Sequence, residues 1–195
     1  MRLLKMYVRA AVAAAGTVTL LAMGAAPAAA QARVPDTGMS AFGVTLGASI
    51  PRDEALANGL DLGAQGEYYL SPRVSVRGKI SGPWFDIQRP GFPDSTVHPI
   101  AFEGNIVHNW EEGIWHPYAT AGIGWYHYGF DEERLQSSAN KFGINLGGGA
   151  EYFLSRRDAV LGELQVRVIP GHAHSLSSDY ETGYWTLAVG YKRYF

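Results

Sequence analysis

The sequence contains no cysteine, which excludes a disulfide framework, a zinc–thiolate site and thiol catalysis. Charge is scarce too, because Asp, Glu, Lys and Arg make up 17% of the 195 residues, against roughly 25% in ordinary soluble domains. The formal net charge of −2 leaves no basic surface for phosphates, so nucleic acid is not an expected partner. Beyond the N-terminus, no stretch offers the roughly 18 consecutive apolar residues of a membrane helix. The chain is rich instead in hydrophobic residues (47%) and aromatic residues (12%), which excludes a disordered chain.

The N-terminal segment differs in composition from the rest of the chain. Three basic residues begin it, an uncharged apolar stretch follows, and small residues end it. This order predicts a secretory signal peptide over residues 1–32, cleaved after Ala30 or Ala32. A single membrane anchor is the alternative, but the small residues favour cleavage. We therefore expect an exported protein, with residues 33–39 as a short periplasmic segment and residues 40–195 as one domain.

The remaining sequence alternates between apolar and polar or small residues with a period of two. This pattern is typical of β-strands with two different faces. It recurs in eight segments: 42–50, 60–70, 74–80, 100–106, 118–126, 142–154, 160–168 and 184–195. Several segments are about ten residues long, the length that a tilted strand needs to cross a bilayer. The predicted fold is all-β, an eight-stranded antiparallel up-and-down transmembrane β-barrel over residues 40–195.

Long and short connections alternate between these segments, as they do in transmembrane barrels. The long ones are expected outside the cell, at residues 51–58, 82–96, 129–140 and 170–181. The short ones are expected in the periplasm, at residues 71–73, 110–116 and 155–158. An even number of strands places both chain ends in the periplasm. The fourth strand would begin directly after the connection at residues 82–96, but Pro99 would then lie two residues into it. Proline interrupts a strand's hydrogen bonds, so this strand is expected to begin later.

Aromatic residues gather near the ends of the predicted strands, and Phe102 alone lies in the middle of one. Amphipathic rings favour the boundary between acyl chains and headgroups, so a barrel in lipid carries two aromatic girdles. A soluble sandwich has no reason to keep aromatic rings away from its strand centres. The distribution therefore favours a membrane barrel.

Three sequence stretches resemble the small eight-stranded outer-membrane barrels of OmpA/OmpX type: residues 117–124, 147–154 and 191–195. The resemblance implies an integral protein of the outer membrane in a Gram-negative cell envelope, with porin-like architecture. It also implies that Tyr191 and the terminal Phe195 form the signal read by the barrel-assembly machinery. Outer-membrane lipid and lipopolysaccharide are the other implied partners. We expect a monomer without a cofactor.

Eight charged residues share the register that faces the barrel lumen: Glu67, Arg77, Lys79, Glu103, Glu151, Glu163, Arg167 and Lys192. Paired carboxylates could perform acid–base chemistry. However, an eight-stranded barrel has little more than side-chain room inside, and buried charges must be paired. The pattern therefore predicts a lumen closed by a network of ion pairs, without catalytic or metal-binding residues.

Two of the long connections carry residues suited to a contact at the cell surface. Trp84, Phe85 and Phe92 are predicted to be exposed, and could equally belong to the outer aromatic girdle. His172 and His174 would point to the same side of an extended segment, a spacing that could bind zinc or copper. No acidic or cysteine partner is fixed by the spacing, so solvated loop histidines are the simpler interpretation.

The sequence thus predicts a non-enzymatic outer-membrane barrel with a structural or surface-contact role through its four outer loops. A lipid A-modifying enzyme is the first alternative. The His–x–Ser motif of the deacylase barrels is absent, since His174 directly precedes Ser175, and the pair Asp94–Ser95 lacks the histidine of a palmitoyltransferase. A soluble lipocalin-like barrel is the second alternative, and it would place the apolar register inside.

Overall fold

The computed structural model describes residues 35–52, 56–86, 96–110, 113–132, 135–170, 172–174 and 179–195. The predicted signal peptide at residues 1–32 lies outside these ranges, and so does Phe92. Within the described part, no helix is long and apolar enough to span a membrane.

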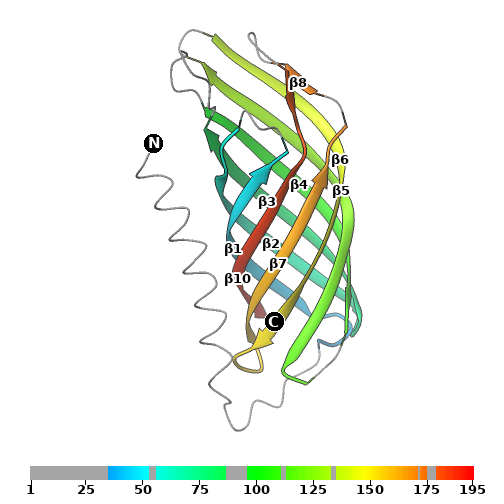
Figure 1. The fold of residues 1–195 in the computed structure, drawn as a ribbon. Helices are drawn as coiled ribbons and strands as arrows, with labels where there is room; N and C mark the ends of the chain where they lie inside the picture. Colours follow the sequence, from blue (N-terminus) through cyan, green and yellow to red (C-terminus); the bar gives the residue numbers. More distant parts are fainter. Residues whose placement is uncertain are drawn as a thin grey trace.

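Eight antiparallel strands form a closed barrel, as the sequence predicts (Figure 1). The strands are β1 (Ser40–Pro51), β2 (Gly59–Ser71), β3 (Val74–Asp86), β4 (Thr96–Asn109), β5 (Trp115–Glu132), β6 (Leu135–Phe153), β7 (Asp158–Val168) and β10 (Tyr184–Tyr194). Each strand pairs with the next along the chain, and β10 closes the sheet on β1. Two short strands, β8 (His172–His174) and β9 (Asp179–Glu181), pair only with each other.

Burial follows the period of two. In β1, Ala41 and Thr45 are buried, whereas Phe42, Val44 and Leu46 are about half exposed. The other strands repeat this arrangement, with polar residues inside and large apolar residues outside. A soluble barrel has the opposite polarity, so the lipocalin-like alternative is wrong. The outer surface of the barrel is apolar and is therefore suited to contact with the hydrocarbon chains of a membrane.

Both ends of the described barrel meet at one rim. Ser40 donates a backbone hydrogen bond to Phe195 (3.4 Å) and accepts one from it (2.9 Å). The short β2–β3, β4–β5 and β6–β7 turns lie at this same rim, which we call the terminal rim. The opposite end is called the loop rim. Gly113 in the β4–β5 turn has φ of 69°, a backbone conformation that favours glycine.

Several strands extend further towards the loop rim than the sequence predicts. The predicted connections at residues 82–96 and 129–140 are partly strand, because β3 runs to Asp86 and β5 and β6 form a long hairpin. Hydrophobic alternation is produced by contact with lipid on one face. A hairpin that continues beyond the lipid keeps its backbone pairing and loses that pattern. The period-two signal therefore ends before the strands do.

The prediction that β4 begins after Pro99 is also wrong, since Pro99 lies inside this strand. Pairing between β3 and β4 is interrupted at residues 82–84 and 98–100, and it resumes in the same register on the loop-rim side. In that register Pro83 stands opposite Pro99. Neither proline has an N–H group to donate, so the ladder breaks locally. Each proline still has a partner on its other neighbouring strand, which keeps both in the sheet.

The rims give a direct test of topology. Arg73 and the pair Arg156–Arg157 are exposed in turns at the terminal rim, whereas Arg52 is exposed at the loop rim. Trypsin added to sealed cells is expected to leave Arg73, Arg156 and Arg157 intact, because the sequence predicts that these turns face the periplasm. Permeabilised cells are the control, and cleavage at these arginines should begin there. Cleavage at the same sites in sealed cells would show the reverse orientation.

Candidate functional site: the charged lumen

All eight charged residues of the predicted lumen network point into the barrel and are at most 6% exposed. They come from six strands, β2, β3, β4, β6, β7 and β10, because each occupies the inward register of its strand. The network is described below from the terminal rim to the loop rim.

Near the terminal rim, Lys192 joins two carboxylates. Its Nζ lies 2.7 Å from Glu67 Oε2 and also donates to Glu151. Glu67 further accepts hydrogen bonds from Arg77 Nε at 3.1 Å and from the Ser75 hydroxyl. Each charge in this part of the lumen therefore has an opposite charge beside it, as burial requires.

In the middle of the lumen, Glu163 joins two cations from the opposite wall. Its carboxylate lies 2.6 Å from Arg77 Nη1 and 2.6 Å from Lys79 Nζ, and it accepts a hydrogen bond from the Tyr118 hydroxyl at 2.9 Å. Glu163 is on β7 and both cations are on β3. These two strands are four places apart in either direction around the barrel. The ion pairs therefore cross the full width of the lumen.

Nearer the loop rim, Arg167 is the centre of the network, and its side chain is fully buried. Its Nε lies 2.7 Å from Glu103 Oε1, and its Nη1 donates to the Thr186 hydroxyl at 2.7 Å. Its Nη2 donates to Gln165 at 3.0 Å and to Ser81 at 3.2 Å. The planar guanidinium thus joins groups from four strands at one height of the barrel.

Sequence reasoning missed one lumen acid, Asp61, which is 3% exposed. It accepts hydrogen bonds from the hydroxyls of Ser49 (3.1 Å) and Thr186 (3.4 Å). Among the described side chains it forms no ion pair. Asp61 occupies the same inward register of β2 as Glu67, so strand periodicity could have identified it. Its hydroxyl partners could not be predicted, because they come from other strands.

Aromatic clusters lie at both ends of the charged region. Towards the loop rim the cluster contains Phe85, Tyr126, Tyr128, Ile169 and Tyr184. At the terminal rim the second cluster contains Ala41, Tyr69, Phe153, Ala159 and Tyr194. The ion pairs are therefore separated from both rims by packed apolar side chains, which favours an inaccessible network.

The prediction that Phe85 is exposed for a surface contact is wrong. Phe85 is 2% exposed and packs edge-on against Tyr184, with ring centroids 5.6 Å apart. Its burial follows from the extra length of β3, which continues the inward register up to this residue. Trp84 points outwards instead, is 44% exposed and lies beside the His98 ring. The side chains of Phe92, His172 and His174 lie outside the described part of the structure.

Tyr191 and Phe195 lie on the outer face at the terminal rim, with 40% and 66% of their surfaces exposed. The Tyr191 hydroxyl donates to Asp158 at the start of β7. Phe195 is attached to the barrel by its backbone bonds to β1. Their role as an assembly signal stays a prediction, and their exposure leaves both rings accessible.

The arrangement offers no open catalytic or metal centre among the described residues. No group of three or more His, Asp or Glu side chains lies close enough there to hold a metal ion. Ser75 donates to Glu67 and Ser49 donates to Asp61 inside the lumen, where all four side chains are buried, and Ser155 donates to Asp158 in the β6–β7 turn at 2.6 Å. Glu67 is already bound to Arg77 and Lys192.

Comparison with known proteins agrees with this geometry. The family model described as "Outer membrane protein beta-barrel domain" matches residues 18–192. No curated protein matches the sequence significantly. Several solved structures share the fold, among them these three. The outer membrane protein OprG from Pseudomonas aeruginosa is 11% identical, with 86% of this chain and 99% of that chain covered and a TM-score of 0.68.

The second similar structure is Ail, the attachment invasion locus protein of Yersinia pestis. It is 12% identical, with 82% of this chain and 99% of Ail covered and a TM-score of 0.59. The third is the N-terminal β-barrel domain of Pseudomonas aeruginosa OprF, at 15% identity, 82% and 100% coverage and a TM-score of 0.51. At these identities the similarity shows the fold.

Proposed function

Since the chain belongs to the family of outer membrane protein β-barrel domains and resides in the outer membrane, we propose that it is a non-enzymatic barrel with a lumen closed by ion pairs. Its role is structural or one of surface contact through the four connections at the loop rim. Outer-membrane lipid and lipopolysaccharide surround it, and the barrel-assembly machinery inserts it as a monomer.

The ion pairs that cross the lumen carry this proposal. Arg77 and Lys79 on β3 both lie 2.6 Å from Glu163 on the opposite strand, β7. A chain of contacts continues from them to Lys192 on one side and, through Gln165, to Arg167 on the other. An eight-stranded barrel is too narrow to hold these side chains beside a continuous column of water.

Enzymatic activity is not part of the proposal, because the buried carboxylates already have partners. Glu103 accepts hydrogen bonds from Arg167, Gln165 and Tyr126, and Glu163 accepts from two cations and Tyr118. A general acid or base must exchange its proton with a substrate at hydrogen-bond distance. The residues at loop positions that suggested a lipid A-modifying enzyme, Asp94, Ser95 and Ser175, lie outside the described ranges.

Electrical recording tests the closed lumen. Purified barrel inserted into a planar lipid bilayer is expected to show no large, steady conductance, because the side chains of the network fill the pathway. A general porin in the same bilayer is the control and should produce stepwise currents. Porin-sized steps that persist as the barrel is purified further would show an open lumen and contradict the proposal.

A further inference from the structure

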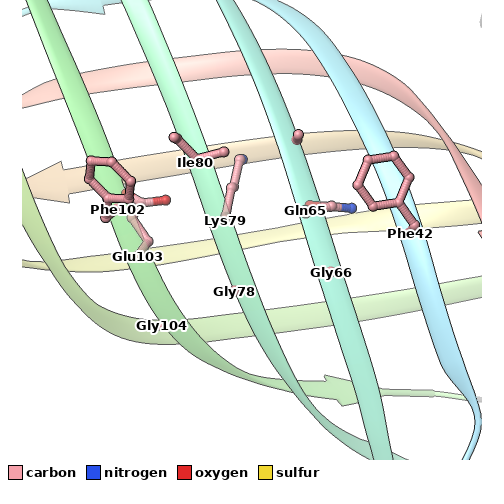
Figure 2. A pocket seen from close by; sticks show the side chains of 10 residues that line it. Phe42, Gln65, Gly66, Gly78, Lys79, Ile80, Phe102, Glu103 and Gly104 are labelled. Atoms are coloured by element: carbon pink, nitrogen blue, oxygen red, sulfur yellow. The ribbon is translucent and has the colours of Figure 1, made fainter.

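The lipid-facing wall contains a hollow of about 580 Å³ over the first four strands (Figure 2). Phe42, Ile80 and Phe102 border it with their side chains, and its floor is formed by three glycines. The lining surface is almost entirely apolar, because Lys79, Glu103 and other polar residues of these strands point to the lumen. The volume lies within the ~300–1,000 Å³ of ordinary small-molecule sites.

The floor consists of Gly66, Gly78 and Gly104, which pair directly with one another across β2, β3 and β4. Some inward glycines are required by close packing: a Cβ at Gly149, for example, would lie 2.1 Å from the backbone oxygen of Gly162 on the neighbouring strand and 2.8 Å from the Tyr118 hydroxyl. A Cβ at any of the three floor glycines would meet nothing within 4 Å. The packing of the barrel therefore does not require glycine here, although glycine weakens a strand.

A glycine inside a strand often marks a bulge, a tight bend or a place where a ligand approaches the backbone closely. Pairing runs through these three glycines without a shift of register, so they mark no bulge. The borders of the hollow support this interpretation. Phe42 and Phe102 are about half exposed on either side of the floor, and Phe102 is held by the Trp125 ring, 5.4 Å away between centroids. The Phe102 side of the hollow is therefore held by a second ring before any ligand binds.

The surroundings indicate the chemistry of the ligand. The hollow is continuous with the outer apolar surface, where Leu62 and Ile106 are also exposed. This surface is the interface with membrane hydrocarbon. Gly66 and Gly78 lie in the halves of β2 and β3 that lead to the terminal rim, and this rim is the one predicted to face the periplasm. The periplasmic leaflet is the nearer source of hydrocarbon chains.

We propose that this hollow is a binding groove for one acyl chain of a phospholipid in the periplasmic leaflet. A flexible chain can lie across the glycine floor and contact the backbone, with the two phenylalanine rings beside it. A second protein is a poorer match, because a stable protein interface buries about 800 Å² on each partner. The floor of the groove spans only three strands.

Photocrosslinking in a bilayer tests the groove. The full barrel is placed in vesicles of phosphatidylethanolamine that carry a diazirine midway along one acyl chain, and labelled peptides are mapped after irradiation. In the wild type we expect labelling of the strands around Ile80 and Phe102 to exceed that of β7 several-fold. Gly78→Leu should lower it to the level of β7. The matched control is Gly162→Leu, at an outward glycine of β7 that also has open space around its Cβ.

Even labelling around the wild-type barrel would overturn the proposal, and so would unchanged labelling in Gly78→Leu. Heat-modifiable migration shows whether each variant has folded, and Gly104→Val replaces Gly78→Leu if the latter has not. A wild-type dimer in analytical ultracentrifugation that Gly78→Leu converts to monomer would assign the groove to a second copy and overturn the lipid assignment. None of these results depends on whether the lumen conducts ions.

Discussion

Replacing Arg167 with alanine is expected to lower the free energy of unfolding by about 3–5 kcal/mol, the cost of removing one partner from a buried ion pair. Arg167 is the cation paired with Glu103, at 2.7 Å, and both side chains are fully buried. Without it, Glu103 would keep only the neutral donors Tyr126 and Gln165. An unpaired charge would remain in the lumen. Equilibrium unfolding in detergent micelles or lipid vesicles measures the loss.

Two other arginines provide a scale for this effect. Arg77→Ala should cost less than Arg167→Ala, because both carboxylates that Arg77 contacts keep a lysine partner. Arg193→Ala removes an exposed pair with Asp158 at 3.6 Å, and its cost should fall within ~0–1 kcal/mol. Adding Glu103→Gln to Arg167→Ala should recover part of the stability. Equal losses for Arg167→Ala and Arg193→Ala would show that water already screens the lumen charges.

Loss of the Phe195 ring should prevent assembly while leaving the sheet itself intact. Phe195 is 66% exposed, and it is bonded to β1 only through its backbone, so its ring contributes little packing to the barrel. If the ring is recognised during assembly, Phe195→Ala should accumulate as unassembled protein in the periplasm. The measurement is the fraction of heat-modifiable barrel in outer-membrane preparations.

Phe142→Ala is the matched control, because Phe142 is also an outward ring and is 76% exposed on β6. It lies far from the chain terminus, so its loss should leave assembly unchanged. The same variants refolded from denaturant into detergent separate recognition from stability, and both should fold there. Normal levels of assembled Phe195→Ala in cells would contradict a role as the assembly signal.

The sequence was sufficient to predict the barrel, its strand number and the inward register of the eight network residues. Strand periodicity carries this information, because one face meets lipid and the other a narrow polar interior. The partner of each charge could not be predicted. Lys79 stands beside Glu103 in the sheet, yet it forms its ion pair with Glu163 across the lumen. That choice depends on the barrel's diameter and stagger, which no single strand encodes.

The errors have a common physical origin near the loop rim. The sequence predicts Phe85 on the surface and Pro99 before its strand, because hydrophobic alternation ends before the strand does at both places. Backbone pairing continues without it: β3 keeps its register up to Asp86, and β4 tolerates Pro99 at a local break in the ladder. Alternation reports contact with lipid, whereas strand length reports hydrogen bonding between backbones.

Closure of the barrel has a consequence for the order in which it forms. Seven of the eight strand pairs in the barrel join strands that are consecutive barrel strands along the chain. The eighth pair, β1–β10, joins the two ends of the barrel, for example Ala41 and Tyr194. Closing so long a loop carries an entropy cost that grows with the logarithm of its length, so local hairpins form before it. Lys192 on β10 meets Glu67, on the far side of β1, only after this junction is made. The ion pair between Lys192 and Glu67 therefore forms only when the barrel closes, and it stabilises the closed barrel relative to an open sheet in which all the other strands are paired.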